Sequence, residues 1–259
     1  MSTAILSALP EEQQGLLEGL DGASTVHHAG RDFHLGHWRG RPVVLALSRI
    51  GKVAAATTAT VLVERFRVER IVFTGVAGGL HPSVRVGDTV VAGELLQHDM
   101  DASPIFPSHE VPLYGRSRFP TDPVLSAILI EAARELASDP SRLFDAPTRA
   151  RFSLEAPAVH SGLVLSGDRF VSAASEAAAL RRALPDALAV EMEAAAVAQV
   201  CHDYSVPFAA VRNISDRADD AAHVDFPAYL SQVAGRQAAA LMAALLERLP
   251  ATARAARFT

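Results

Sequence analysis

Short runs of β-branched and aliphatic residues alternate along this 259-residue chain with segments of helical periodicity. This alternation is typical of α/β proteins, in which amphipathic helices pack on the faces of a largely buried sheet. Eight runs are predicted as strands: residues 3–8, 33–39, 43–48, 71–74, 89–96, 162–166, 188–190 and 208–212. We therefore expect an α/β three-layer sandwich, with one central mixed β-sheet between layers of helices.

Helical patterns fill several intervals between these runs. Helices are predicted over residues 11–20 and 53–66, and Thr121-Asp122-Pro123 supplies a cap and a first-turn proline for a helix that reaches about residue 136. The last helix begins near residues 225–227 and aligns Leu230, Ala234, Ala238, Leu241, Leu245 and Leu249 on one face. Residues 99–120 and 138–157 follow no regular period and are predicted as long loops.

Composition indicates one soluble domain. Hydrophobic residues make up 49% of the chain, which is enough to bury a sizeable core. We expect a single domain over residues 1–250 and a flexible tail over 251–259. Cys201 is the only cysteine, so an internal disulfide is excluded, and the N-terminal sequence does not resemble a signal peptide. The expected location is the cytoplasm.

Charge argues against large anionic partners. The net charge is -5, and the sequence contains no block of like charges. Proteins that bind nucleic acid or anionic membranes usually carry a basic face, because phosphate groups dominate those interactions. We therefore expect neither nucleic acid nor a membrane as a partner, and a small molecule as the ligand.

The segment 189–201, AVEMEAAAVAQVC, places Glu191 and Glu193 two residues apart in an apolar run. The pair follows a strand and opens a helix, at the edge where open α/β sheets bind ligands. A buried carboxylate without partners costs several kcal/mol, so each must meet helix amides, an arginine or ligand hydroxyls such as a vicinal diol. From spacing alone, capping of the helix explains both residues equally well.

Two further segments place acids after strands. In VRNISDRADD, Asp216 and Ser215 could exchange a proton with a substrate, and Arg212 could orient a nucleophile or pair with a carboxylate. The alternative there is a capping aspartate with a surface arginine. In SALPEEQQ, Glu11 and Glu12 could equally favour the dipole of a helix that begins there.

The segment FTGVAGGL sets Gly75, Gly78 and Gly79 after a strand, where the backbone could approach a ligand closely. It matches neither the dinucleotide fingerprint nor a P-loop. Taken in order, however, ALPEE, SRIGKVAAA, FTGVAGGL, VGDTVV, HDMD, SGDRFV, VEMEAAAVAQVC and VRNISDRAD resemble the 5'-methylthioadenosine/S-adenosylhomocysteine nucleosidases of the nucleoside phosphorylase superfamily. The resemblance runs from about residue 3 to residue 249.

This resemblance implies a nucleoside phosphorylase-like fold and hydrolysis of the N-glycosidic bond of thio-substituted adenine nucleosides, without a metal or organic cofactor. Such a cleavage needs an acid to protonate the leaving base and a carboxylate to prepare water. By match to the family motifs, Asp216 protonates adenine at N7 and is held by Ser215. Glu12 activates the water, and Arg212 helps to hold that arrangement.

The resemblance also assigns the substrate contacts. Glu193 matches the residue that binds the ribose hydroxyls, with Met192 packed against the sugar, so Glu191 is predicted to be structural. Phe170 matches the ring that stacks on adenine, and Val171 the residue whose backbone reads the base edge. The remaining implied positions are Ile50 and Phe226 around the 5'-alkylthio group, Val76 near the water site, Gly78 as a further substrate-binding position, and Ile105 or Phe106 from the second subunit of a homodimer.

Three positions depart from the family pattern: Val76 replaces a common serine, Arg49 a common glycine, and Pro10 an acid. The effect of Val76 and Arg49 on the water site stays open. So does the ranking of methylthioadenosine, S-adenosylhomocysteine, 5'-deoxyadenosine and futalosine-type nucleosides as substrates.

Three alternatives to hydrolysis are a phosphorylase, a non-enzymatic binding protein and a metal-dependent enzyme. A phosphorylase is the nearest alternative, but a carboxylate about 4 Å from a phosphate charge costs roughly 4 kcal/mol at an effective dielectric of about 20. A non-enzymatic nucleoside-binding relative would not need all three acids. A metal site at His34 and His37 or in HDMD (98–101) matches no strong ligand spacing.

Overall fold

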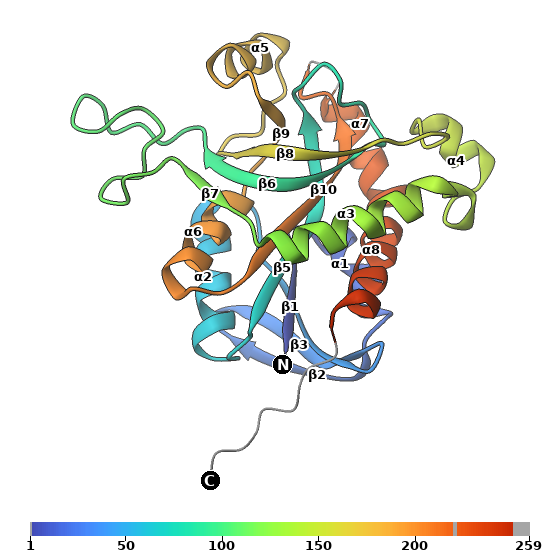
Figure 1. The fold of residues 1–259 in the computed structure, drawn as a ribbon. Coiled ribbons are helices and arrows are strands. Elements are labelled where there is room, and N and C mark those ends of the chain that lie inside the picture. The colour runs from blue at the N-terminus through green and yellow to red at the C-terminus, as the bar shows by residue number, and fades with distance from the viewer. Residues whose placement is uncertain (1, 220–221, 251–259) are drawn as a thin grey trace.

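The strands form one mixed sheet, which the computed structural model describes over residues 2–219 and 222–250 (Figure 1). Residues 251–259, predicted as a tail, lie outside the described residues. The strands are β1 (Thr3–Ser7), β2 (Asp21–His28), β3 (Arg31–Trp38), β4 (Arg41–Leu47), β5 (Arg70–Gly79), β6 (Thr89–Gln97), β7 (Arg118–Pro120), β8 (Val159–Ser166), β9 (Ala187–Glu191) and β10 (Phe208–Asp216). The predicted α/β fold with a central mixed sheet is confirmed.

Half of this sheet closes on itself. The strand order is β10-β6-β8-β9-β5-β1-β4-β3-β2, and β5 also pairs with β10, so that β5, β10, β6, β8 and β9 form a ring. Strands β1, β4, β5 and β10 run parallel, whereas β9 joins β5 and β6 joins β10 in antiparallel pairs. As a result, β5 lies between β10 on one side and β9 on the other near its carboxyl end.

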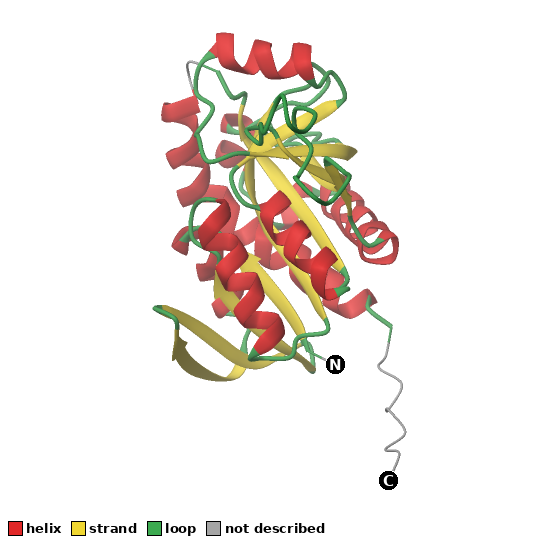
Figure 2. Ribbon diagram, turned by 90° about the vertical axis from the view of Figure 1, so that its left-hand side faces the viewer, coloured by secondary structure: helices red, strands yellow, loops and turns green. Residues whose placement is uncertain are grey.

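Helices cover both faces of the sheet (Figures 1 and 2). They are α1 (Pro10–Leu17), α2 (Lys52–Glu64), α3 (Pro123–Ser138), α4 (Ala146–Arg151), α5 (Ala174–Ala183), α6 (Ala194–Tyr204), α7 (Ala222–Tyr229) and α8 (Gly235–Arg248), with short helical segments η1 (Pro140–Arg142) and η2 (Leu230–Ala234). Alternate side chains of a strand point to opposite faces. In β1, Ala4 and Leu6 share a core with α2 and α6, whereas Ile5 packs with α1, α3 and α8.

The structure corrects several sequence predictions. Strand β2 was missed because its sequence, DGASTVHH, lies mostly exposed and has no apolar alternation, and β7 is only three residues long. The predicted loop 138–157 contains η1 and α4, and its Phe152 packs edge-on against Tyr229 at 5.5 Å between ring centroids. The single helix predicted from about residue 225 to 249 is divided into α7, the π-helical η2 and α8.

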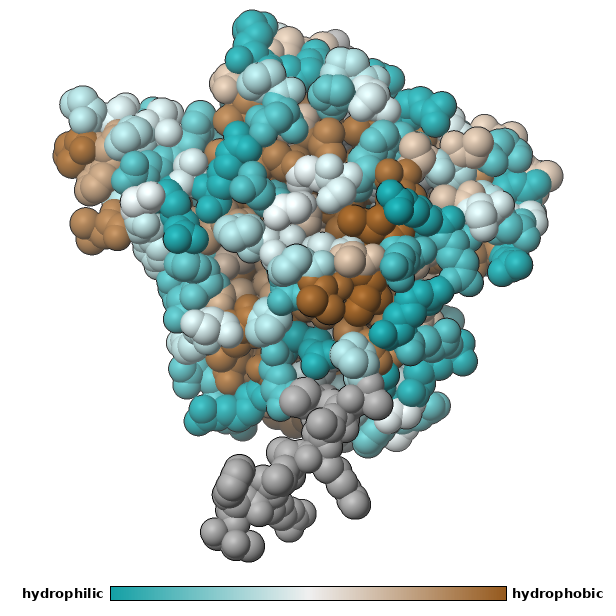
Figure 3. Space-filling view, in the orientation of Figure 1, coloured by the Kyte–Doolittle hydropathy of each residue, from teal (hydrophilic) through white to brown (hydrophobic). Residues whose placement is uncertain are grey.

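The segment between β6 and β7 projects from the body of the molecule at the left of Figure 1. It carries Ile105 and Leu113, whose side chains are 82% and 91% exposed. Figure 3 shows hydrophobic atoms gathered on this projection.

Within residues 2–219 and 222–250, no helix is both long and apolar enough to cross a lipid bilayer.

Candidate active site

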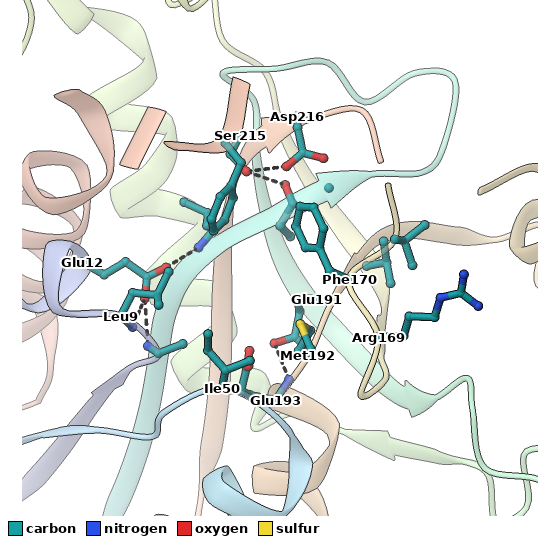
Figure 4. A pocket seen from close by; sticks show the side chains of 17 residues that line it. Leu9, Glu12, Ile50, Arg169, Phe170, Glu191, Met192, Glu193, Ser215 and Asp216 are labelled. Carbon is teal, nitrogen blue, oxygen red and sulfur yellow. Dashed lines mark hydrogen bonds between the residues drawn. The ribbon is translucent and has the colours of Figure 1, made fainter. Parts of the chain in front are cut away.

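A cavity of about 330 Å³ lies where the segments following β1, β4, β8, β9 and β10 meet (Figure 4). Its volume falls in the usual range for small-ligand pockets, roughly 300–1,000 Å³. Most of the predicted site residues line it: Glu12, Ile50, Val76, Gly78, Phe170, Val171, Met192, Glu193, Ser215, Asp216 and Phe226. The fold thus brings together residues that lie more than 200 positions apart in the sequence.

Glu12 folds back on the N-terminus of its own helix. Its Oε2 accepts hydrogen bonds from the amides of Ala8 and Leu9 at 2.8 and 3.0 Å, and its Oε1 accepts one from the amide of Val76 at 3.0 Å. The side chain is only 2% exposed. Burial raises the pKa of Glu12, while the positive charge of Arg212 and the three amides lower it in part. A buried carboxylate held this way suits a base that accepts a proton from water.

Glycines on β5 leave space for two of the acids. A Cβ atom on Gly75 would lie 2.9 Å from Glu12 Oε1, and one on Gly78 would lie 2.9 Å from Asp216 Oδ1. Any other residue at these positions would displace the carboxyl groups. The sequence prediction was that these glycines allow close approach of a ligand, and Gly78 does line the cavity. The structure adds a second reason for both.

A β-bulge positions Ser215 and Asp216. The register of β10 against β5 pairs Ile214 with Ala77 and Asp216 with Gly78, which leaves Ser215 as the extra residue. Bulges redirect side chains that would otherwise alternate between faces. Both residues therefore reach the cavity, and the Ser215 hydroxyl donates to Asp216 Oδ2 at 2.8 Å. The amide of Ala218 donates to Asp216 Oδ1 at 2.8 Å.

Glu191 is saturated by donors of the protein itself. Arg212 Nη2 donates to its Oε2 at 2.7 Å, the Ser166 hydroxyl donates to its Oε1, and the amides of Glu193 and Ala194 donate at 3.1 and 2.9 Å. Both charged partners are almost fully buried. Arg212 is therefore not a surface residue, and it lies behind Glu191 rather than in the cavity lining. Glu191 also performs the capping of α6 that the sequence left open for both glutamates.

Glu193 has a different environment. In the described part of the chain its carboxylate accepts one hydrogen bond, from the amide of Gly51 to Oε1 at 2.9 Å. Its side chain makes no capping bond to α6, although Glu193 is the N-cap residue. Burial, followed by the neighbouring Glu191 carboxylate, raises the pKa of Glu193 to about 8. A buried carboxylate with so few protein donors can accept hydrogen bonds from a bound ligand.

Aromatic and aliphatic side chains line the rest of the cavity. The rings of Phe170 and Phe226 meet at 5.5 Å between centroids with an interplanar angle of 62°. Phe170 is 41% exposed and Ile50 is 56% exposed, so both border the opening. By contrast, Ile105 and Phe106 lie on the projecting segment and do not line the cavity of this chain. Their predicted contribution to the site of a second subunit stays a prediction.

Sequence reasoning missed the residues that act through their backbone. Leu9 and Gly51 donate amides to Glu12 and Glu193, and an amide carries no residue-type signal. For Gly51 a signal existed, because in SRIGKVAAA a glycine stands two residues before the predicted helix 53–66. Gly51 is the N-cap of α2 and adopts φ 93°. Arg49 also has a positive φ, of 64°, and its guanidinium donates to the carbonyl of Gly30.

The geometry of the site bears on the role of Val76 and on metal binding. Val76 replaces a serine hydroxyl of the family pattern, but its backbone amide still binds Glu12. For metal binding, the described ranges contain no group of three or more His, Cys, Asp or Glu side chains arranged around a common point. His34 instead contacts the Thr25 hydroxyl through Nδ1 at 2.9 Å.

Comparison with known proteins gives a consistent result. The model of the phosphorylase superfamily matches residues 2–249. The 5'-methylthioadenosine/S-adenosylhomocysteine nucleosidase from Neisseria meningitidis, solved with methylthio-immucillin-A, is 33% identical, with a TM-score of 0.84 over 96% of this chain and 99% of that one. The S-adenosylhomocysteine nucleosidase from Streptococcus pyogenes is 29% identical, with a TM-score of 0.85 over 97% and 98%. A futalosine hydrolase mutant of Helicobacter pylori is 30% identical, with a TM-score of 0.82 over 95% and 99%.

Proposed function

This chain belongs to the phosphorylase superfamily, and we propose that it is a nucleosidase that hydrolyses 5'-methylthioadenosine and S-adenosylhomocysteine to adenine and the corresponding thioribose. 5'-Deoxyadenosine is a further expected substrate. The observation that carries the proposal is the arrangement of Glu12, Glu193 and Asp216 around one cavity (Figure 4). Similarity to nucleosidases solved with adenosine-like inhibitors supports it.

In the proposed reaction, Asp216 donates its proton to N7 of adenine while the Ser215 hydroxyl holds the carboxyl group. The bond from C1' to N9 then breaks with its electron pair on the base, which leaves an oxocarbenium-like ribosyl cation. Water adds to C1', and Glu12 accepts the proton that this water loses. The amides that hold the Glu12 carboxylate fix its orientation towards the water.

The remaining contacts would bind the nucleoside. The ionised Glu193 carboxylate accepts hydrogen bonds from the ribose hydroxyls, and the negative charge of this form stabilises the ribosyl cation. Phe170 stacks on adenine, and the backbone of Val171 reads the base edge. Ile50 and Phe226 pack around the apolar 5'-alkylthio group, with Met192 against the sugar.

Water is favoured over phosphate as the nucleophile because the described residues that line the cavity provide no unpaired cation for a phosphate dianion. Arg212 is held by Glu191 at 2.7 Å, which neutralises its charge. Arg169 is the only cationic residue in the lining among the described residues, and it forms an ion pair with Glu176 at 3.3 Å while its side chain is 77% exposed. A phosphate would instead meet the buried carboxylates of Glu12 and Glu193.

The proposal includes a cytoplasmic homodimer. Ile105 exposes most of its side chain. It belongs to the segment between β6 and β7, which projects from the body of the molecule (Figure 1). Leu113 on the same segment is also exposed, and exposed apolar side chains that gather in one patch are typical of an interface. We propose that Ile105 or Phe106 completes the 5' side of the cavity of a second copy of the chain.

Futalosine hydrolysis is the second candidate, because the similarity to the Helicobacter pylori futalosine hydrolase is nearly as high as that to the nucleosidases. The test is release of free base in phosphate-free buffer from methylthioadenosine, S-adenosylhomocysteine, 5'-deoxyadenosine and futalosine, compared by kcat/KM. The proposal expects adenine release at a rate independent of added phosphate. A strict requirement for phosphate would refute hydrolysis, and a preference for futalosine would establish the second candidate.

A further inference from the structure

Three loops that follow strands are joined beside the cavity by a closed network of Lys52, Asp99 and Asp168. Lys52 begins α2 after the β4 loop, and its Nζ donates to Asp99 Oδ1 at 2.5 Å in the segment after β6. Asp99 Oδ2 accepts the amide of Asp168, in the segment after β8, at 2.8 Å. Asp168 Oδ1 in turn accepts the amide of Lys52 at 2.7 Å. The predicted site residues include none of the three.

This network reaches Glu193 through Gly51. The Gly51 amide supplies the one hydrogen bond that the described chain gives to the Glu193 carboxylate, at 2.9 Å. Gly51 adopts φ 93°, and a Cβ atom there would lie 3.1 Å from Asp168 Oδ1. Because glycine has wide conformational freedom, its amide direction depends on what holds the adjacent peptide. Asp168 holds it by accepting the Lys52 amide.

The same aspartate anchors the segment that carries Phe170. Asp168 lies two residues before Phe170, and its own amide is fixed on Asp99. One side chain therefore links the loop whose Gly51 amide binds Glu193 to the loop that carries the predicted adenine-stacking ring. Asp168 itself does not line the cavity, and its side chain is 50% exposed, so its effect must pass through its neighbours.

We propose that Asp168 is a positioning residue, which aims the Gly51 amide at Glu193 and so orients this carboxylate for the ribose hydroxyls. The inference rests on the proposed nucleosidase function, because it concerns recognition of the ribose in that reaction. If Asp168 only capped α2, its loss would lower kcat/KM for all substrates equally. A positioning role instead predicts that substrates with and without the 2'-hydroxyl respond differently to its loss.

The test compares methylthioadenosine with its 2'-deoxy analogue in the Asp168→Ala and Asp168→Asn variants. A hydrogen bond to a charged group is worth about 1.5–3 kcal/mol, so Asp168→Ala should lower kcat/KM for the ribonucleoside by about 10- to 100-fold. The 2'-deoxy analogue should lose less than about threefold, well below the value of one such bond. Asp168→Asn keeps an oxygen for the Lys52 amide and should restore most of the ribose preference.

A pH profile gives a second readout. The Gly51 amide lowers the pKa of Glu193 in the folded protein. If this amide no longer points at Glu193 in Asp168→Ala, the pKa of Glu193 should rise, and the acid limb of the pH profile of kcat/KM should move to higher pH. The matched control is Asp101→Ala in the same segment as Asp99. Asp101 is exposed and, within the described residues, accepts hydrogen bonds only from Ser103, through its side chain and through its amide at 2.9 Å, so its variant should retain wild-type values.

Folding of each variant is checked by its thermal transition. If Asp168→Ala does not fold, Asp99→Ala removes the acceptor of the Asp168 amide and should reduce the ribose preference in the same direction. A folded Asp168→Ala with an unchanged preference and acid limb, or with equal losses on both substrates, overturns the inference. Calorimetric affinities for the two nucleosides, measured with Asp168→Ala in an Asp216→Asn background, decide it without turnover. Wild-type protein that releases no adenine would refute the proposed function alone.

Discussion

Glu191 and Glu193 are both buried, yet the same Glu→Gln substitution should change stability in opposite directions at the two positions. Glu191 accepts from Arg212, from the Ser166 hydroxyl and from two amides, so the NH2 group of a glutamine would face donors. The substitution would also leave the buried charge of Arg212 without its partner. Removal of one partner from a buried ion pair costs about 3–5 kcal/mol.

At Glu193, by contrast, the negative charge of the buried carboxylate destabilises the folded state. Burial raises its pKa from 4.5 to about 8, so the folded state binds a proton that the unfolded state has already released between these values. Glu193 therefore does not reduce the free energy of unfolding below pH 4.5. As the pH rises from 4.5 to about 8, the free energy of unfolding decreases. At about 1.4 kcal/mol per pH unit, the rise sets an upper limit of about 5 kcal/mol on the destabilisation. Glu193→Gln removes the charge and keeps an oxygen for Gly51.

Unfolding in urea and on heating, at pH 6 and pH 9, measures both effects. For a chain of this size about 1 kcal/mol corresponds to 2–4 °C, so Glu191→Gln should lower Tm by roughly 6–20 °C at both pH values. Glu193→Gln should raise Tm at pH 9 and should raise it by less than half as much at pH 6. The reasoning is refuted if both variants shift Tm in the same direction at pH 9, or if the effect of Glu193→Gln is independent of pH.

Three further predictions concern activity. Asp216→Asn should abolish adenine release while calorimetry still detects nucleoside binding, and a near-normal rate would exclude Asp216 as the acid. Glu12→Gln should abolish hydrolysis; in the wild type, kcat/KM should begin to fall with decreasing pH above pH 4.5, because burial raises the pKa of Glu12 and the base must be ionised. Gly75→Ala would place a Cβ atom 2.9 Å from Glu12 Oε1 and should lower kcat by about 100-fold, the effect of a displacement of roughly 1 Å. Gly93→Ala, whose Cβ atom would have its nearest contact at 3.8 Å, is the matched control and should be nearly as active as the wild type.

Much of the fold followed from local patterns. The core strands were predicted because buried strands of an α/β sheet are continuous apolar runs, and β1 is buried at every position. Strand β2 escaped prediction because it is exposed, so burial left no pattern in its sequence. The division of the last helix at η2 was also missed, since the apolar stripe over Leu230 and Leu241 continues through it.

The sequence by itself determined that this chain forms an α/β sheet and that acids follow its strands, because both depend on neighbouring residues. It also placed Glu12, Glu193 and Asp216 at positions that the fold later brought together. Both glutamates line the cavity, and only the tertiary structure decided which of them is satisfied by donors of the protein itself. That choice depends on partners far along the chain: Arg212 pairs with Glu191, and Gly51 binds Glu193. Such contacts arise when half of the sheet closes through the pairing of β5 with β10, a pairing that no local pattern encodes.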